Sequence, residues 1–241
     1  MLFMKNKFCY FICIMVLLSI SMNTQAQLQE ESVAKLVIRH KIQYLVWLPS
    51  GYNIVKNKKW PLMLFLHGKG ERGTVLETVK KNGPPHFVEQ QPDFPFILIS
   101  PLCPDEQYWS IDELDALLTS LISKYRIDED RVYLTGLSMG GFGTWAYATE
   151  HPERLAAIAP ICGGGDTHRI KELINVPVWA FHGAKDDVVP VERSIEMVNA
   201  LNCAGGNARL TIYPDANHNS WDAAYSDPEL FKWILSKTRK K

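Results

Sequence analysis

The sequence predicts one doubly wound α/β domain, in which helices cover both faces of a mostly parallel sheet. Near-continuous apolar runs rich in Val, Ile, Leu and Phe recur along the chain, as expected for strands that are buried on both faces. Helical patterns lie between these runs, and the connections are short. The composition agrees, because 46% hydrophobic and 22% charged residues are typical of an ordinary globular domain.

The predicted strands differ in pattern between the start of the chain and the rest. Residues 36–52 alternate apolar and polar side chains, which predicts two antiparallel edge strands, closed by the turn residues Pro49, Ser50 and Gly51. The later runs are apolar almost throughout and predict parallel strands at 61–68, 94–101, 131–138, 176–183 and 208–214.

Helices are predicted where apolar residues recur at helical spacing. Ser110 and Glu113 form a capping box ahead of apolar positions that share one helix face up to residue 125. Further helical patterns occupy 139–151, 192–203 and 227–238. No linker, repeat or low-complexity stretch divides the sequence.

The first 26 residues have the order of a secretory signal peptide. Two lysines precede the apolar run 8–20, and a short polar stretch then ends at the small residue Ala26. The run is shorter than the about 20 residues that a membrane span needs. We therefore expect cleavage after Ala26, a catalytic domain at 27–241, secretion or a periplasmic location, and no stable membrane insertion. An uncleaved anchor and a buried helix are the alternatives.

Net charge and cysteine content limit the classes of partner and the covalent links that the sequence allows. Removing the predicted signal peptide takes away Lys5 and Lys7 and leaves 24 basic against 26 acidic residues, a net charge of −2. This balance offers no basic face for a nucleic acid partner. Export permits disulfides, and the mature chain keeps Cys103, Cys162 and Cys203. A Cys103–Cys162 pair, each directly after a predicted strand end, and three free thiols both remain open.

The pattern Gly136-x-Ser138-x-Gly140 lies where the strand 131–138 gives way to a helical pattern. A nucleophile on such a strand-to-helix turn adopts a strained backbone conformation at the carboxyl edge of the sheet. Flanking glycines prevent collisions between the turn and the neighbouring strand and helix. The pattern predicts that Ser138 is a nucleophile, and the alternative is an inert serine in a tight turn.

A serine hydroxyl becomes a good nucleophile only when a base accepts its proton. His218 is the predicted base, because it lies in a polar loop directly after the last predicted strand, at the same sheet edge as Ser138. The acid that would orient this imidazole is expected after the strand 176–183, where Asp186 and Asp187 are both candidates. The order Ser, acid, His is typical of α/β-hydrolases.

Two backbone N–H groups are predicted to form an oxyanion hole. One belongs to Met139, which follows the nucleophile, and the other to Lys69 in the glycine-containing stretch LHGKGERG. A phosphate-binding loop is the alternative for this stretch, but the P-loop spacing is absent. The sequence contains neither H-E-x-x-H nor paired Cys/His spacing, so no metal and no cofactor are predicted.

These motifs resemble the α/β-hydrolase branch of predicted peptidases and phospholipase/carboxylesterase-like proteins. That branch is related to dienelactone hydrolases, feruloyl and acetylxylan esterases and the catalytic domain of prolyl oligopeptidases. The likeness covers about residues 40–235 and includes PLMLFLHGKGERG, RVYLTGLSMGGFGTWAYA, VPVWAFHGAKDDVVP and NHNSWDAAY. It implies a single α/β-hydrolase domain with Ser138 as nucleophile and His218 as base.

The resemblance also separates the two candidate acids. The D-x-x-V-P spacing of the family falls on Asp186 to Pro190, which implies that Asp186 is the acid and Asp187 a bystander. Lys69 follows His-Gly, where the family usually supplies an oxyanion N–H from a residue with a small side chain. The connections are too short for a propeller or a helical cap, so we expect no large cap domain and an open groove.

Aromatic residues in predicted strand-end loops are candidates for substrate binding. Tyr108, Trp109 and Trp221 could stack on a sugar or phenolic ring, or could pack beneath the loops. The expected function is an exported serine hydrolase that cleaves small carboxylic esters, or acyl and feruloyl esters of plant polysaccharide. A serine peptidase of the prolyl-oligopeptidase type and a catalytically inactive binding protein are the alternatives. The sequence does not predict an oligomeric state.

Overall fold

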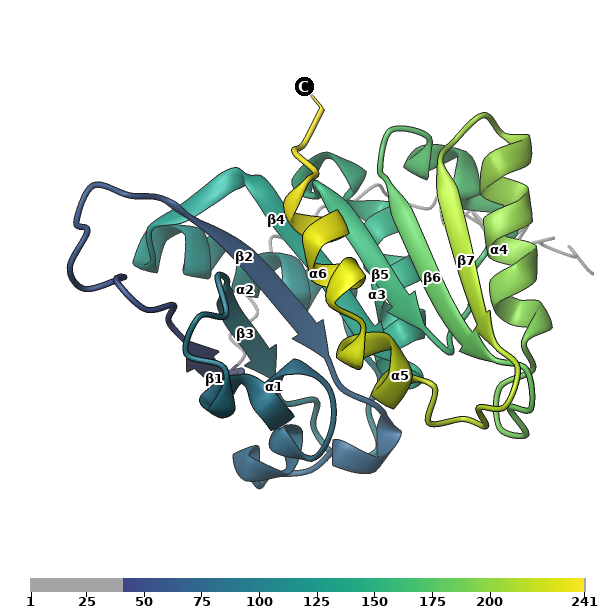
Figure 1. Ribbon diagram of the computed structural model, residues 1–241, viewed down its shortest axis with the longest axis horizontal. Helices are drawn as coiled ribbons and strands as arrows, with labels where there is room; N and C mark the ends of the chain where they lie inside the picture. The colour runs from purple at the N-terminus through teal and green to yellow at the C-terminus, as the bar shows by residue number, and fades with distance from the viewer. Residues whose placement is uncertain (1–40, 241) are drawn as a thin grey trace, which may run out of the picture. The chain divides into compact units, whose positions relative to one another are not determined.

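A seven-stranded sheet runs through residues 41–240, the part of the chain that the computed structural model describes (Figure 1). The predicted signal peptide, residues 1–26, lies outside the described residues. The strands lie in the order β1-β3-β2-β4-β5-β6-β7. Their bounds are Tyr44–Trp47 for β1, Trp60–Leu66 for β2, Ile97–Pro101 for β3, Ile127–Leu137 for β4, Ala157–Ile161 for β5, Val178–Gly183 for β6 and Ala208–Tyr213 for β7.

The predicted, mostly parallel sheet is confirmed. Strand β1 pairs antiparallel with β3, and the neighbouring pairs from β3 to β7 are parallel. Strands β2, β3, β5 and β6 are buried along their whole length, as their apolar sequences predict. Of the predicted edge pair, β1 is present, and most of the other strand lies outside the described residues.

Strand β4 begins four residues before its predicted start. Trp60 pairs with Ile127, and the register then shifts before Leu62 meets Val132. Three of the four intervening residues are acidic and the fourth is Arg131, and all are less buried than the rest of the strand, so their sequence does not resemble a buried strand. Pairing with β2 nevertheless extends the strand to Ile127.

Helices cover both faces of the sheet, in agreement with the predicted layers (Figure 1). Helices α2, α3 and α4 pack into one hydrophobic cluster, and α1, α5 and α6 pack into a second cluster on the opposite face. Their bounds are Pro84–Phe87 for α1, Ile111–Lys124 for α2, Met139–Glu150 for α3, Glu192–Cys203 for α4, Trp221–Ser226 for α5 and Pro228–Leu235 for α6.

Local capping explains where two of the predicted helices begin. The Ser110 hydroxyl accepts a hydrogen bond from the N–H of Glu113 at 3.4 Å, directly before α2. The Asp227 carboxylate accepts one from the N–H of Glu229 at 2.9 Å, directly before α6. Helices α1 and α5 were not predicted, because they are too short to show helical periodicity.

Within residues 41–240, no helix combines the length and the apolar character that crossing a bilayer requires.

The first turn of α3 lies against the ends of β2 and β4, and Gly140 permits this approach. A Cβ atom added at Gly140 would overlap the main-chain carbonyl of Leu66, the last residue of β2. A Cβ at Gly136 would collide with the carbonyl of Gly140. Because these obstacles are backbone atoms, no side-chain rotation could relieve the overlap.

Substituting Gly140 with alanine is expected to destabilise the fold. Separating α3 from β2 should lower the free energy of unfolding by about 3 kcal/mol or more, which corresponds to a fall in Tm of about 6–12 °C for a domain of this size. The matched control is Gly70→Ala, because a Cβ at Gly70 meets no atom within 4 Å. Differential scanning calorimetry measures both variants. Equal Tm values for the two would contradict this account of the packing.

Candidate active site

Three side chains from separate strand ends meet at the carboxyl edge of the sheet. Ser138 directly follows β4, Asp186 lies in the loop after β6, and His218 lies in the loop after β7 (Figure 1). The Nε2 atom of His218 is 2.9 Å from the Ser138 hydroxyl oxygen. Its Nδ1 atom is 2.8 Å from Oδ2 of Asp186. The structure therefore brings the predicted nucleophile, base and acid into one hydrogen-bonded chain.

Ser138 occupies a strained turn. Its backbone has φ 52° and ψ −117°, a conformation that costs a non-glycine residue about 1–3 kcal/mol. The N–H of Ser138 donates to the carbonyl of Ile161 at the end of β5, at 3.0 Å. This hydrogen bond and the close packing of α3 fix the turn, and the hydroxyl consequently points toward His218.

Asp186 is held in its ionised form. Burial alone would raise its pKa, but hydrogen bonds from His218 and from the N–H groups of Val189 and Val188 outweigh burial and lower the pKa below its usual value. An ionised carboxylate only accepts hydrogen bonds, so Nδ1 of His218 carries the hydrogen. The lone pair of Nε2 then faces the Ser138 hydroxyl. Asp187, the other candidate acid, is exposed.

The two predicted oxyanion donors both lie at the first position of a helical segment. Met139 begins α3, and Lys69 begins the short 3-10 helix Lys69–Glu71. The first N–H groups of a helix have no acceptor within that helix. A Cβ at Gly68 would lie 3.6 Å from Cβ of Ser138, so the segment before Lys69 runs beside the nucleophile. This placement allows both N–H groups to face the reaction centre.

The imidazole of His67 anchors the segment that carries Lys69. Its Nε2 atom accepts a hydrogen bond from the N–H of Cys103 at 3.0 Å, and its Nδ1 atom lies 2.7 Å from the carbonyl oxygen of Gly68. Burial lowers the pKa of His67, so the ring is neutral with the hydrogen on Nδ1. His67 therefore serves as a structural anchor for this segment.

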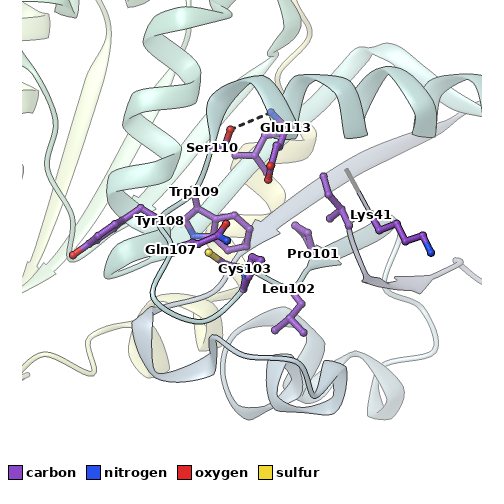
Figure 2. A pocket seen from close by; sticks show the side chains of 12 residues that line it. Lys41, Pro101, Leu102, Cys103, Gln107, Tyr108, Trp109, Ser110 and Glu113 are labelled. Carbon is purple, nitrogen blue, oxygen red and sulfur yellow. Dashed lines mark hydrogen bonds between the residues drawn. The ribbon is translucent and has the colours of Figure 1, made fainter. Parts of the chain in front are cut away.

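The three candidate substrate-binding aromatics lie in different environments. Trp109 donates from its indole N–H to the carbonyl of His67 at 3.2 Å and packs edge-on against that ring, so it supports the loop from beneath. Tyr108 is 70% exposed and points away from its neighbours in Figure 2. Trp221 packs edge-on against His218, with ring centroids 5.3 Å apart. Trp221 is thus the aromatic in contact with the triad.

A cavity of about 140 Å³ lies behind Trp109, between the end of β3 and the start of α2 (Figure 2). Cys103, Gln107 and Glu113 contribute to its lining. Ser138, Asp186 and His218 do not contribute to its lining, so the cavity is separate from the hydrogen-bonded chain.

Residues 100–226 match the profile of the family described as "Dienelactone hydrolase family". This segment is just over half of the chain and contains Ser138, Asp186 and His218. The chain belongs to the dienelactone hydrolase family. The resemblance to the α/β-hydrolase fold is thereby confirmed.

Solved structures of esterases share this fold. The crystal structure of a thermostable esterase superposes with a TM-score of 0.76 at 34% identity, covering 82% of this chain and 60% of that chain. A ferulic acid esterase shares the fold, with a TM-score of 0.63 at 20% identity, covering 81% of this chain and 93% of that chain.

Among curated sequences, a carboxymethylenebutenolidase homologue of Escherichia coli K12 is 32% identical over 124 residues. That region is 48% of this chain and 45% of the relative. This dienelactone hydrolase family member thus spans about half the length of the curated relatives that it matches.

Two residues beneath the site of this family member were not predicted to have a role. His182 lies in β6 with its ring buried against Asp186. Cys162 follows β5 with φ 41°, and its sulfur lies within 4.8 Å of ligand-type atoms of both Asp186 and His218. The sequence shows only that a histidine and a cysteine lie at strand ends. It does not reveal which neighbours their side chains contact.

Cysteine, carboxylate and imidazole are also metal-ligand types. The group of Cys162, Asp186 and His218 is therefore compatible with either metal binding or proton transfer. Burial raises the pKa of the Cys162 thiol to about 12, and it stays protonated at neutral pH. Both ring nitrogens of His218 are already hydrogen-bonded, Nδ1 to Asp186 at 2.8 Å and Nε2 to Ser138 at 2.9 Å. Both observations favour proton transfer over metal binding. Cys103, Cys162 and Cys203 are free thiols in the structure, which answers the open question of pairing.

Proposed function

We propose that the protein is a serine hydrolase that cleaves carboxylic esters through an acyl-enzyme on Ser138. The observation that carries this proposal is the unbroken chain of hydrogen bonds from the Ser138 hydroxyl through His218 to a buried, ionised Asp186. In such an arrangement the imidazole can accept the serine proton, and the carboxylate stabilises the resulting imidazolium. Membership of a hydrolase family and the likeness to esterases support the same chemistry.

The geometry supports a two-step reaction. His218 accepts the hydroxyl proton while Oγ of Ser138 attacks the ester carbonyl, and the N–H groups of Met139 and Lys69 stabilise the developing oxyanion. His218 then donates that proton to the departing alcohol, which leaves an acyl group on Ser138. Water attacks the acyl-enzyme with His218 again as base. Transfer of the proton back to Oγ releases the carboxylic acid and restores Ser138.

For the substrate, we propose small carboxylic esters or acyl and feruloyl esters carried on plant polysaccharide, hydrolysed outside the cytoplasm. The fold shared with a ferulic acid esterase supports the ester class. The signal-peptide pattern at residues 1–26, outside the described residues, supports export. The exposed side chain of Lys69 beside the nucleophile offers a positive charge that could discriminate among substrates.

Ser138→Ala tests the nucleophile and, with a substrate panel, the reaction class. The wild type is expected to hydrolyse p-nitrophenyl acetate, longer acyl esters, methyl ferulate or acetylated xylan faster than aminoacyl anilides. The variant should lose about 10⁴-fold or more in kcat, because it lacks the attacking oxygen. Activity that survives in the variant would overturn the assignment of Ser138. Faster anilide turnover would favour a peptidase, and binding without turnover would favour an inactive binding protein.

Asp186→Asn and Asp187→Asn form a matched pair that tests the acid. An amide at 186 could not stabilise the imidazolium of His218, and we expect kcat to fall by about 10⁴-fold. The same change at the exposed Asp187 should leave kcat within about twofold, because a surface substitution away from the site changes little. Steady-state hydrolysis of p-nitrophenyl acetate measures both. If Asp187→Asn proved the more damaging change, the acid would have to be reassigned.

A further inference from the structure

We infer that His182 is a positioning residue for the proposed reaction: its Nε2 atom, hydrogen-bonded to the carbonyl of Val189, also contacts Oδ2 of Asp186 at 3.2 Å and thereby fixes the carboxylate that orients His218. This inference rests on the proposed function of Ser138. His182 lies in β6, four residues before Asp186, and both side chains are 0% exposed. The two groups therefore meet away from solvent, where a hydrogen bond is strong and an unpaired polar group is costly.

The position of the hydrogen on His182 follows from its neighbours. Its Nε2 atom is 3.2 Å from Oδ2 of Asp186 and 2.9 Å from the carbonyl oxygen of Val189. Both oxygens only accept hydrogen bonds, and a lone pair on Nε2 would face two buried acceptors. Nε2 therefore carries a hydrogen, which it donates to the carbonyl of Val189 while Oδ2 of Asp186 lies 3.2 Å from the same nitrogen.

The opposite side of the ring is held as well. The Nδ1 atom of His182 is 2.7 Å from the hydroxyl oxygen of Ser194. Because Nε2 carries the ring hydrogen, the single hydroxyl hydrogen of Ser194 is donated to Nδ1 and not to the carbonyl of Gly163, which lies 3.0 Å away. Ser194 is fully buried. The ring is thus fixed at both nitrogens by groups from two segments of the chain, the loop after β6 and α4, and its orientation toward Asp186 is set before any substrate binds.

The two oxygens of Asp186 depend on different donors. Oδ1 accepts the N–H groups of Val188 and Val189 at 3.0 and 2.8 Å. Oδ2 accepts Nδ1–H of His218, a side chain that is 19% exposed, and lies 3.2 Å from Nε2 of His182. Without His182, Oδ2 would keep only its contact with the partly exposed His218, while the two bonds to Oδ1 would remain. His182 consequently fixes the oxygen atom that sets the orientation of the base.

Cys162 is the other ionisable group that faces this carboxylate, and it cannot replace the imidazole. Its sulfur lies within 4.8 Å of Asp186 and His218. A thiol is a weak hydrogen-bond donor, whereas imidazole N–H is a strong one. Lys185 and Asp187, which flank Asp186 in the loop, are exposed to solvent. The contact between His182 and Asp186 is therefore the one to remove in a test.

Glutamine and asparagine at position 182 form a matched pair. The amide nitrogen of Gln can occupy the place of Nε2 and still donate to Asp186, whereas that of Asn reaches only the place of Nδ1, beside Ser194. We expect His182→Asn to lower kcat for p-nitrophenyl acetate by about 10- to 100-fold through misplacement of the base, with KM changed less than about threefold. His182→Gln should restore most of kcat. Equal losses in both variants would overturn the inference.

A double-mutant cycle separates positioning from a general structural effect. In an Asp186→Asn background, His182→Asn should change the remaining kcat by less than about threefold, because its route to His218 is already lost. The same fold-loss in both backgrounds would show that His182 acts independently of Asp186, which contradicts the inference. Thermal denaturation confirms that each variant is folded. If His182→Asn prevents folding, the double variant His182→Gln/Ser194→Ala supplies the test. Its kcat must then stay near that of His182→Gln alone.

Different outcomes would exclude the proposed function and the role of His182. If Ser138→Ala or Asp186→Asn left activity intact, the proposed function would be wrong whatever the behaviour of position 182. If both abolished activity while Gln and Asn at 182 behaved alike, only the role of His182 would be lost.

Discussion

At Ser138 the backbone turns from β4 into α3 with φ 52° and ψ −117°, and the rest of the site depends on this turn. The turn exists because Gly136 and Gly140 carry no Cβ, which lets the start of α3 lie against the carbonyl of Leu66. Packing of α3 against the sheet offsets the cost of the strained residue. The same turn puts the side chain of Ser138 and the N–H of Met139 on one side of the sheet edge, so the proposed nucleophile and the proposed oxyanion donor share a single structural cause.

The parallel sheet brings Asp186 and His218 to the same edge as Ser138. Because parallel strands end at one edge, the loops after β4, β6 and β7 converge without any long connection. Burial would favour a neutral Asp186, but hydrogen bonds from His218, Val188 and Val189 keep its carboxylate charged. A buried charge beside a partly exposed imidazole is the electrostatic arrangement that ester hydrolysis by an activated serine requires.

Sequence patterns predict the part of this site that follows from local rules. The apolar runs, the glycines around Ser138 and the loops after the strands identify the sheet, the turn and the positions of Asp186 and His218. The choice between Asp186 and Asp187 came only from the resemblance to a family, because two adjacent loop carboxylates look alike until the loop is folded. The 3.2 Å contact between His182 and Asp186 depends on the angle at which the loop after β6 turns back. The role of Trp109 is equally hidden from the sequence, because its packing beneath His67 is a tertiary contact that residue spacing does not reveal.

The central claim is that the strained turn presents Ser138 as an activated nucleophile. Its most direct test is labelling of the folded protein with a fluorophosphonate ester, which phosphonylates activated serines, followed by intact-mass and peptide mass spectrometry. The account predicts a single adduct, located on Ser138 and absent from Ser138→Ala. An adduct on another residue, or labelling that persists in that variant, would contradict it.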